Sequence, residues 1–162
     1  MTTLEETHNS STGRRAAIFY GVAAFVSLVG LVDAIYLTVE HLSGNTLRCT
    51  IITGCSEVLS SPYASVKGMP LAGLGAIAYF TVFSAATLAA FGYKGAGKFA
   101  TFVSSLMFLF TLWLIYLQAF VIKAFCQFCL LSALVTTVMT VLIFLARRQE
   151  RLSIHNPARR PD

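Results

Sequence analysis

The longest apolar stretch of the sequence, residues 99–146, is the feature that most restricts the fold. Its 48 residues contain no Gly or Pro, and apart from two glutamines Lys123 is their only strongly polar residue. One helix of that length would measure about 72 Å, whereas the hydrocarbon core of a bilayer is about 30 Å thick. The run must therefore fold back on itself. With Lys123 at the corner, it gives two membrane spans, at about 99–121 and 125–146.

Two further apolar runs, at about 16–40 and 69–91, predict the first and second spans. Asp33 interrupts the first of them. A carboxylate at membrane depth is costly, so it must face the interior of the bundle, a watery cavity or a partner. We expect Asp33 to be a hydrogen-bonded structural residue, and a role in proton handling is the alternative.

Composition agrees with a small integral membrane protein of a single domain. Of the 162 residues 56% are hydrophobic and 12% are charged, against about 25% charged in soluble domains. The predicted fold is all-α, a membrane four-helix bundle whose large loop, 41–68, contains a short surface helix at about 56–61. We predict that residues 1–15 form a disordered tail and that residues 147–162 form a basic tail.

The positively charged residues are distributed unevenly among the loops and tails. The formal net charge is +5, but nine of the twelve Lys and Arg residues fall on the two tails and on the short connection 92–98. This bias predicts that both termini and this connection are cytoplasmic, and it argues against binding of nucleic acid. The nine residues are Arg14, Arg15, Lys94, Lys98, Arg147, Arg148, Arg151, Arg159 and Arg160.

In this topology Cys49, Cys55, Cys126 and Cys129 all lie on the non-cytoplasmic side, where disulfides form and persist. Three pairings of four cysteines are possible, and the sequence does not choose between them. Cys126 and Cys129 form a CxxC motif, whose spacing puts both thiols on one face of a helical turn. The pair can therefore form a disulfide at the edge of the bilayer.

The surroundings of the CxxC motif act on its thiols in opposite directions. Lys123 and the N-terminus of the last span lower the thiol pKa values, whereas the apolar surroundings raise them. We expect the lowering effects to dominate at Cys126, which we predict to be the more exposed sulfur. Cys55 is predicted to lie near the N-terminus of the loop helix, which favours its thiolate as well.

Several motifs together resemble the vitamin K epoxide reductase family, and its bacterial members most. The resemblance covers about residues 16–146. The motifs are the loop Cys49-x5-Cys55-Ser56, then Ser60-Ser61-Pro62-Tyr63, the CxxC motif opening the last span, Tyr36-Leu37-Thr38 and Met69-Pro70-Leu71-Ala72.

The resemblance implies a thiol–quinone oxidoreductase in a bacterial inner membrane. Cys126 and Cys129 match the family's CxxC pair, with Cys129 as the sulfur that meets the quinone, ubiquinone or menaquinone. Cys49 and Cys55 match its shuttle pair. Ser60 matches a serine of the family's loop helix and is a weaker candidate for contact with the quinone.

Many bacterial relatives carry a fused thioredoxin-like domain, whereas here only a basic tail of about 16 residues follows the last span. The resemblance therefore implies a separate thioredoxin-fold partner, similar to DsbA, which the enzyme oxidises to support disulfide formation. The cysteines would then face the extracytoplasmic side of the membrane.

Two other functions remain open at this point. Vitamin K quinone or its epoxide is an alternative substrate, but Ala133 stands where vertebrate enzymes carry a substrate-binding tyrosine, which favours plain quinone. A membrane scaffold with two structural disulfides is the non-enzymatic alternative. Metal binding is disfavoured. Zinc sites usually combine two CxxC-like motifs, whereas here one pair of cysteines is separated by five residues and the other enters the membrane.

Overall fold

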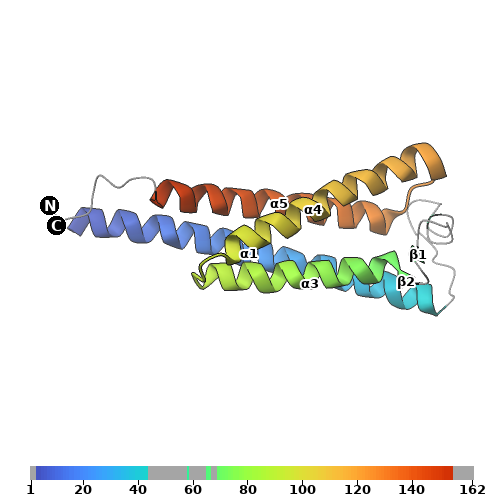
Figure 1. The fold of residues 1–162 in the computed structure, drawn as a ribbon, viewed down its shortest axis with the longest axis horizontal. Helices are drawn as coiled ribbons and strands as arrows, with labels where there is room; N and C mark the ends of the chain where they lie inside the picture. The colour runs from blue at the N-terminus through green and yellow to red at the C-terminus, as the bar shows by residue number, and fades with distance from the viewer. Residues whose placement is uncertain (1–2, 44–57, 59–64, 67–68, 155–162) are drawn as a thin grey trace.

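Four long helices form a bundle in the computed structural model, which describes residues 3–43, 58, 65–66 and 69–154 (Figure 1). The predicted all-α fold is confirmed, with one two-residue hairpin in addition. The elements in chain order are α1 (Thr3–Leu42), β1 (Ser65–Val66), β2 (Met69–Pro70), α3 (Leu71–Ala90), α4 (Ala96–Tyr116), the π-helix η2 (Leu117–Ile122) and α5 (Gln127–Ile154).

Within the described residues, four helical segments are long and apolar enough to cross a membrane. They are Arg14–Leu42, Leu71–Ala90, Ala96–Ile122 and Gln127–Leu152. Large apolar side chains remain exposed along all four, as expected of a surface that faces lipid. The chain is therefore a multi-pass membrane protein, and each predicted span corresponds to one of these helices.

Both ends of the chain are more helical than predicted. α1 begins at Thr3, inside the predicted disordered tail 1–15, and α5 continues past residue 146 to Ile154. Once a span has formed a helix, each added residue gains a hydrogen bond, and residues 3–15 contain no Pro to stop it. At the other end, Arg147 pairs with Glu150 at 2.7 Å, one turn further along the helix.

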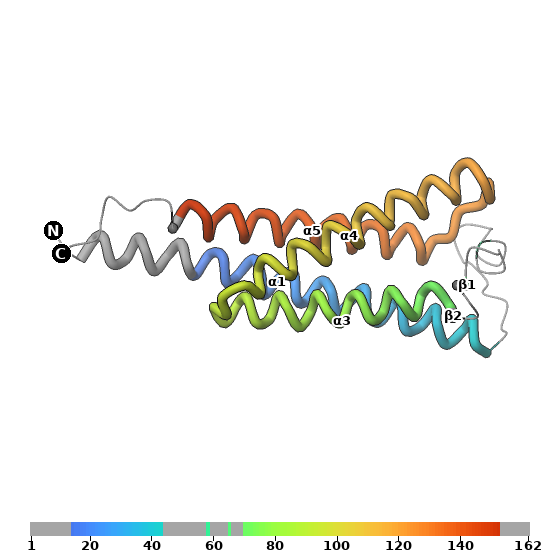
Figure 2. The backbone as a smooth tube through the Cα atoms, in the orientation of Figure 1, coloured from blue at the N-terminus to red at the C-terminus, as the bar shows by residue number. Residues whose placement is uncertain are grey.

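α1 is the central helix of the bundle. It packs against α3 on one side and α5 on the other, while α4 crosses obliquely from α3 towards α5 (Figure 2). The buried core runs along these contacts. Its members are Tyr20, Ala23, Ala34, Tyr79, Val82, Ala85, Ala89, Ala100, Val135, Met139, Ile143 and Ala146.

Gly30 allows the closest approach between α1 and α3. A Cβ atom at this position would overlap with the ring of Tyr79, which lies against it. The Tyr79 hydroxyl continues across the bundle to α5, where it is 2.8 Å from the Ser132 hydroxyl and 2.7 Å from the Thr136 hydroxyl. One side chain therefore links α1, α3 and α5 at the level of Asp33.

The connection between α3 and α4 is short, as the sequence predicted. Gly92 (φ 83°) and Gly95 (φ 93°) both have left-handed backbone conformations, which only glycine adopts without strain. At the opposite end of the bundle lie the start of α5 and the antiparallel pair β1–β2, in which Ser65 faces Pro70 and Val66 faces Met69 (Figure 1). Pro70 is also the N-cap residue of α3.

Candidate functional site

The CxxC motif lies at the first turn of α5. Cys126 precedes the helix, and its carbonyl oxygen accepts a hydrogen bond from the N–H of Leu130 at 3.0 Å. Cys129 lies one turn further into the helix. Both thiols are free. The sequence therefore placed the motif correctly, at the start of the last span.

A tight turn leads into this motif. Lys123 ends η2 with φ 56° and ψ 29°, and it is the one non-glycine residue with positive φ in the described part of the chain. This left-handed residue reverses the chain direction, which confirms the predicted corner at Lys123. The π-helix before it was not predicted, because nothing in the sequence distinguishes a wide turn from an α-helical one.

Gln118 holds this turn from inside. Its amide is 4% exposed, and Oε1 accepts a hydrogen bond from the backbone N–H of Cys126 at 3.2 Å. This bond satisfies a backbone donor at the start of α5, where the first N–H groups have no partner within the helix. We did not predict this role for Gln118. The available signal was an amide within an otherwise apolar run.

The two sulfurs differ in exposure, in the opposite order to our prediction. Cys126 is fully buried, whereas Cys129 is only partly buried. Cys126 belongs to a buried cluster with Leu37 of α1, Val58 of the loop and Ala124. The prediction failed because it treated the start of a span as its open end, whereas a loop residue distant in sequence closes it.

The pKa of Cys126, which lies just before the apolar segment Gln127–Leu152, is lowered. The main cause is a hydrogen bond with the Cys129 thiol, and the backbone N–H groups of Phe128 and Cys129 act in the same direction against the effect of burial. The predicted direction is therefore confirmed, and the helix N-terminus contributes to it as expected. A thiolate at Cys126 is the form that takes part in disulfide exchange.

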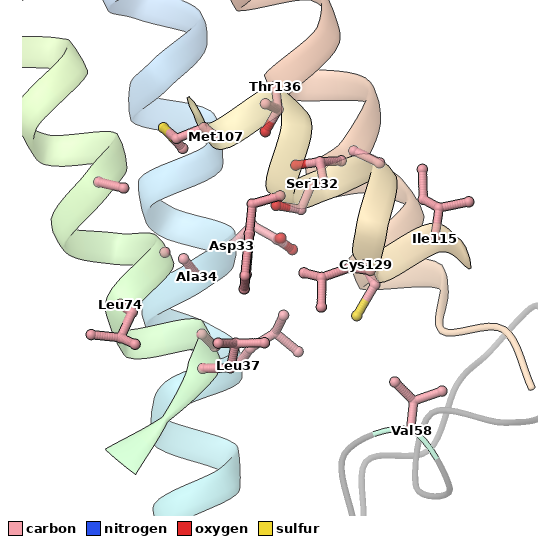
Figure 3. A pocket seen from close by; sticks show the side chains of 18 of the residues that line it. Asp33, Ala34, Leu37, Val58, Leu74, Met107, Ile115, Cys129, Ser132 and Thr136 are labelled. Atoms are coloured by element: carbon pink, nitrogen blue, oxygen red, sulfur yellow. The ribbon is translucent and has the colours of Figure 1, made fainter. Parts of the chain in front are cut away.

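Cys129 lines a cavity of about 460 Å³ in the middle of the bundle (Figure 3). All four long helices contribute to its wall, together with η2, β2 and Val58. Most of the lining side chains are apolar. They are Ala34, Leu37, Val58, Pro70, Leu71, Ala72, Leu74, Ala78, Leu106, Met107, Phe110, Leu114, Ile115, Leu117, Ile122 and Ala133.

A few polar groups converge on this cavity from three helices. Asp33 of α1, Tyr79 of α3, and Cys129, Ser132 and Thr136 of α5 line it, and several of these are seen around it in Figure 3. A mostly apolar cavity of this size with a few convergent polar groups is typical of a small-molecule site. The sequence predicted the sulfur of this site but not the cavity.

The loop cysteines Cys49 and Cys55, together with Ser60, lie outside the described residues, as does the predicted loop helix apart from Val58. Val58 has helical backbone and is 8% exposed, in the same buried cluster as Leu37 and Cys126. At least this residue of the loop therefore packs against the CxxC motif.

Comparison with protein-family models gives a match to the vitamin K epoxide reductase family over residues 22–144. This range includes the whole of α3, α4 and η2, parts of α1 and α5, and every described residue that lines the cavity. The chain belongs to the vitamin K epoxide reductase family. A comparison with curated proteins gave no match.

Membership in the vitamin K epoxide reductase family makes the chain an oxidoreductase, of the quinone-linked kind that the family represents. The resemblance seen in the sequence is thereby confirmed. In this member Ala133, four residues after Cys129, is 7% exposed and lines the cavity. The side chain of Ala133 is a methyl group, so it offers no hydroxyl for a hydrogen bond at this position.

Proposed function

We propose that this vitamin K epoxide reductase family member oxidises the thiols of a separate, extracytoplasmic thioredoxin-fold protein and passes the electrons to a membrane quinone, ubiquinone or menaquinone. Cys49 and Cys55 form the pair that receives electrons from the partner, and Cys126 and Cys129 form the pair that delivers them. In this proposal the protein spans a bacterial inner membrane with both termini in the cytoplasm.

The observation that carries the proposal is the position of Cys129 in the cavity wall. A quinone needs a flat apolar site at membrane depth that also exposes a sulfur, and the cavity provides both. Its volume of about 460 Å³ lies within the range of about 300–1,000 Å³ common for small-molecule sites. Cys126, one turn away and fully buried, is shielded from the cavity's contents and can reach them only through Cys129.

Val58 supports the delivery of electrons from the loop. It packs in the buried cluster that contains Cys126, and it follows Cys55 by three residues. Three residues of chain span at most about 11 Å between Cα atoms. The proposal requires a local rearrangement that uncovers the buried Cys126 before Cys55 and Cys126 exchange.

The proposed electron path consists of thiolate attacks on disulfides. A partner thiolate attacks Cys49 of the Cys49–Cys55 disulfide and frees Cys55. The Cys55 thiolate attacks Cys126 of the Cys126–Cys129 disulfide and frees Cys129. When the second partner thiol has closed the partner's disulfide, Cys49 and Cys55 re-form theirs and leave Cys126 and Cys129 both reduced.

Cys126 and Cys129 then return to the disulfide. The pair gives up two electrons and two protons, and the quinone takes up two of each to become the quinol. A strongly oxidising partner such as DsbA has a potential near about −120 mV, and 30 mV corresponds to about 1.4 kcal/mol for two electrons. Only an acceptor of higher potential, such as a respiratory quinone, can draw electrons from it.

The test is turnover of the full chain in lipid nanodiscs with a reduced DsbA-like protein and a short-chain ubiquinone. We expect quinol to form, and Cys129→Ala to abolish its formation. Cys55→Ala is the corresponding variant of the Cys49–Cys55 pair. It should accumulate a mixed disulfide between Cys49 and the partner, which a non-reducing gel detects. Turnover that survives Cys129→Ala contradicts the proposal. Vitamin K epoxide in place of the quinone tests the alternative substrate, which the absence of a phenol at Ala133 disfavours.

A further inference from the structure

Asp33 is the one charged residue among the buried side chains that the structure describes. It lies well inside the apolar segment Arg14–Leu42, is 8% exposed and lines the same cavity as Cys129. Its Oδ2 atom is buried without a hydrogen-bond partner among the described residues. A structural Asp at this depth is expected to have its oxygens satisfied, because a buried polar group without a partner is costly.

The neighbouring polar groups are already engaged with one another. The Tyr79 hydroxyl is within hydrogen-bond distance of the Ser132 carbonyl at 3.0 Å, and of the hydroxyls of Ser132 and Thr136. This cluster closes on itself between α3 and α5 and leaves Asp33 out. The carboxyl group of Asp33, which lines the cavity, is therefore not engaged by this cluster.

The titratable groups that face Asp33 come from three helices. Tyr79 of α3 and Cys129 of α5 line the cavity together with Asp33, and Cys126 precedes α5 three residues before Cys129. His41 of α1 lines the cavity two turns further along. The part of α4 that lines the cavity contributes only apolar residues and Thr111. No described cation therefore lines the cavity at membrane depth to pair with the carboxyl group of Asp33.

We propose that Asp33 is the proton donor for the quinone that Cys129 reduces. The inference rests on the function proposed above. The carboxylic acid of Asp33 donates its proton to one oxygen of the quinone as the electron pair leaves the Cys126–Cys129 dithiol. The carboxylate so formed takes up one of the two thiol protons that disulfide formation releases, and the other thiol proton goes to the second quinone oxygen. Asp33 ends the cycle protonated, and no outside reagent is needed.

Single-turnover reduction separates this step from the partner. The full chain in nanodiscs is reduced with dithiothreitol, freed of reductant and mixed with short-chain ubiquinone, and quinol formation is followed by absorbance. We expect Asp33→Asn to slow this step about 10²-fold or more, in line with general acid catalysis. Binding of the quinone should change little. Glu40→Gln, the same carboxyl-to-amide change two turns along α1 and outside the cavity lining, should react like the wild type.

The pH profile distinguishes proton donation from a structural role. A general acid acts only while protonated, so the wild-type rate should fall on the alkaline side as Asp33 loses its proton. This alkaline fall should be absent in Asp33→Asn, whereas Asp33→Glu should keep it and recover part of the rate. If Asp33→Asn does not fold, the pH profile of Asp33→Glu decides, and a profile without the alkaline fall overturns the proposal.

Failure of this inference differs from failure of the function on which it rests. A wild-type protein that forms quinol while Asp33→Asn forms it equally fast, with the same pH profile, overturns the role of Asp33 alone. A reduced wild-type protein that forms no quinol overturns the proposed function and the role of Asp33 with it.

Discussion

The side-chain Oε1 of Gln118 accepts the backbone N–H of Cys126 at 3.2 Å, across the turn that joins η2 to α5. Gln118 also lines the cavity that Cys129 faces. One amide thus ties the reversal of the chain to the position of the redox pair. The relationship gives Gln118 a positioning role, which can be measured.

Replacing Gln118 with Leu removes the acceptor and leaves the Cys126 N–H buried without its partner. We expect a loss of stability of about 1–3 kcal/mol, the cost of an unsatisfied buried group. Quinol formation should also slow, because the CxxC motif loses its fixed place. Unfolding in mixed micelles measures stability, and equal stability of Gln118→Leu and wild type would contradict the role.

Gly30 and Gly21 of α1 form a natural pair for testing the contact with Tyr79. Gly30→Ala forces a Cβ into the Tyr79 ring, so we expect a loss of about 1–3 kcal/mol from overpacking. A Cβ at Gly21 meets nothing within 4 Å. Gly21→Ala should therefore be neutral or stabilising by up to about 1 kcal/mol, the gain from helix propensity. If the two variants have the same midpoint of unfolding, the result contradicts the close contact between Gly30 of α1 and Tyr79 of α3.

The left-handed backbone of Lys123 predicts an unusual response to glycine. A left-handed conformation costs a non-glycine residue about 1–2 kcal/mol, part of which the greater chain entropy of glycine offsets. Lys123→Gly should therefore raise the free energy of unfolding by up to about 1 kcal/mol. Lys123→Val should lower it, because a β-branched residue fits this conformation poorly. A lower free energy of unfolding in Lys123→Gly than in the wild type would contradict the left-handed conformation of Lys123.

Val58 is predicted to control access to Cys126. In a chain where Cys49, Cys55 and Cys129 are replaced by Ala, only Cys126 can react with a maleimide. Val58→Ala removes part of its cover, so labelling should become several-fold faster. Val39→Ala, a change at a side chain that is 55% exposed, should leave the labelling rate unchanged. Mass spectrometry of timed samples gives both rates, and equal rates would show that Val58 does not cover the thiol.

The sequence was sufficient for the parts of this fold that depend on length and local composition. The four spans, the corner at Lys123 and the place of the CxxC motif follow from how far an apolar helix can run before it leaves the membrane. The burial of Cys126 and the cavity beside Cys129 did not follow. Both depend on side chains from separate helices, such as Leu37 and Val58, meeting in space.

The surroundings of Asp33 also depend on contacts between separate helices, which the sequence does not show. Its cost in a membrane was clear from the sequence, which left a structural role and a proton-handling role open. We expected it to be hydrogen-bonded, and the structure instead leaves Oδ2 without a partner among the described residues. The outcome depends on Tyr79, which is satisfied by Ser132 and Thr136 and so leaves Asp33 aside. No pattern along the chain encodes that choice.

Photolabelling with an azido-ubiquinone tests most directly whether the cavity beside Cys129 is the quinone site. The full chain in nanodiscs is illuminated with the probe, digested and mapped by mass spectrometry, with and without an excess of unlabelled quinone. We expect labels on cavity-lining residues such as Leu37, Leu74 and Ala133, and we expect the excess of unlabelled quinone to remove them. Labels found only on the outer surfaces of the helices, at residues such as Phe25 or Phe102, would contradict it.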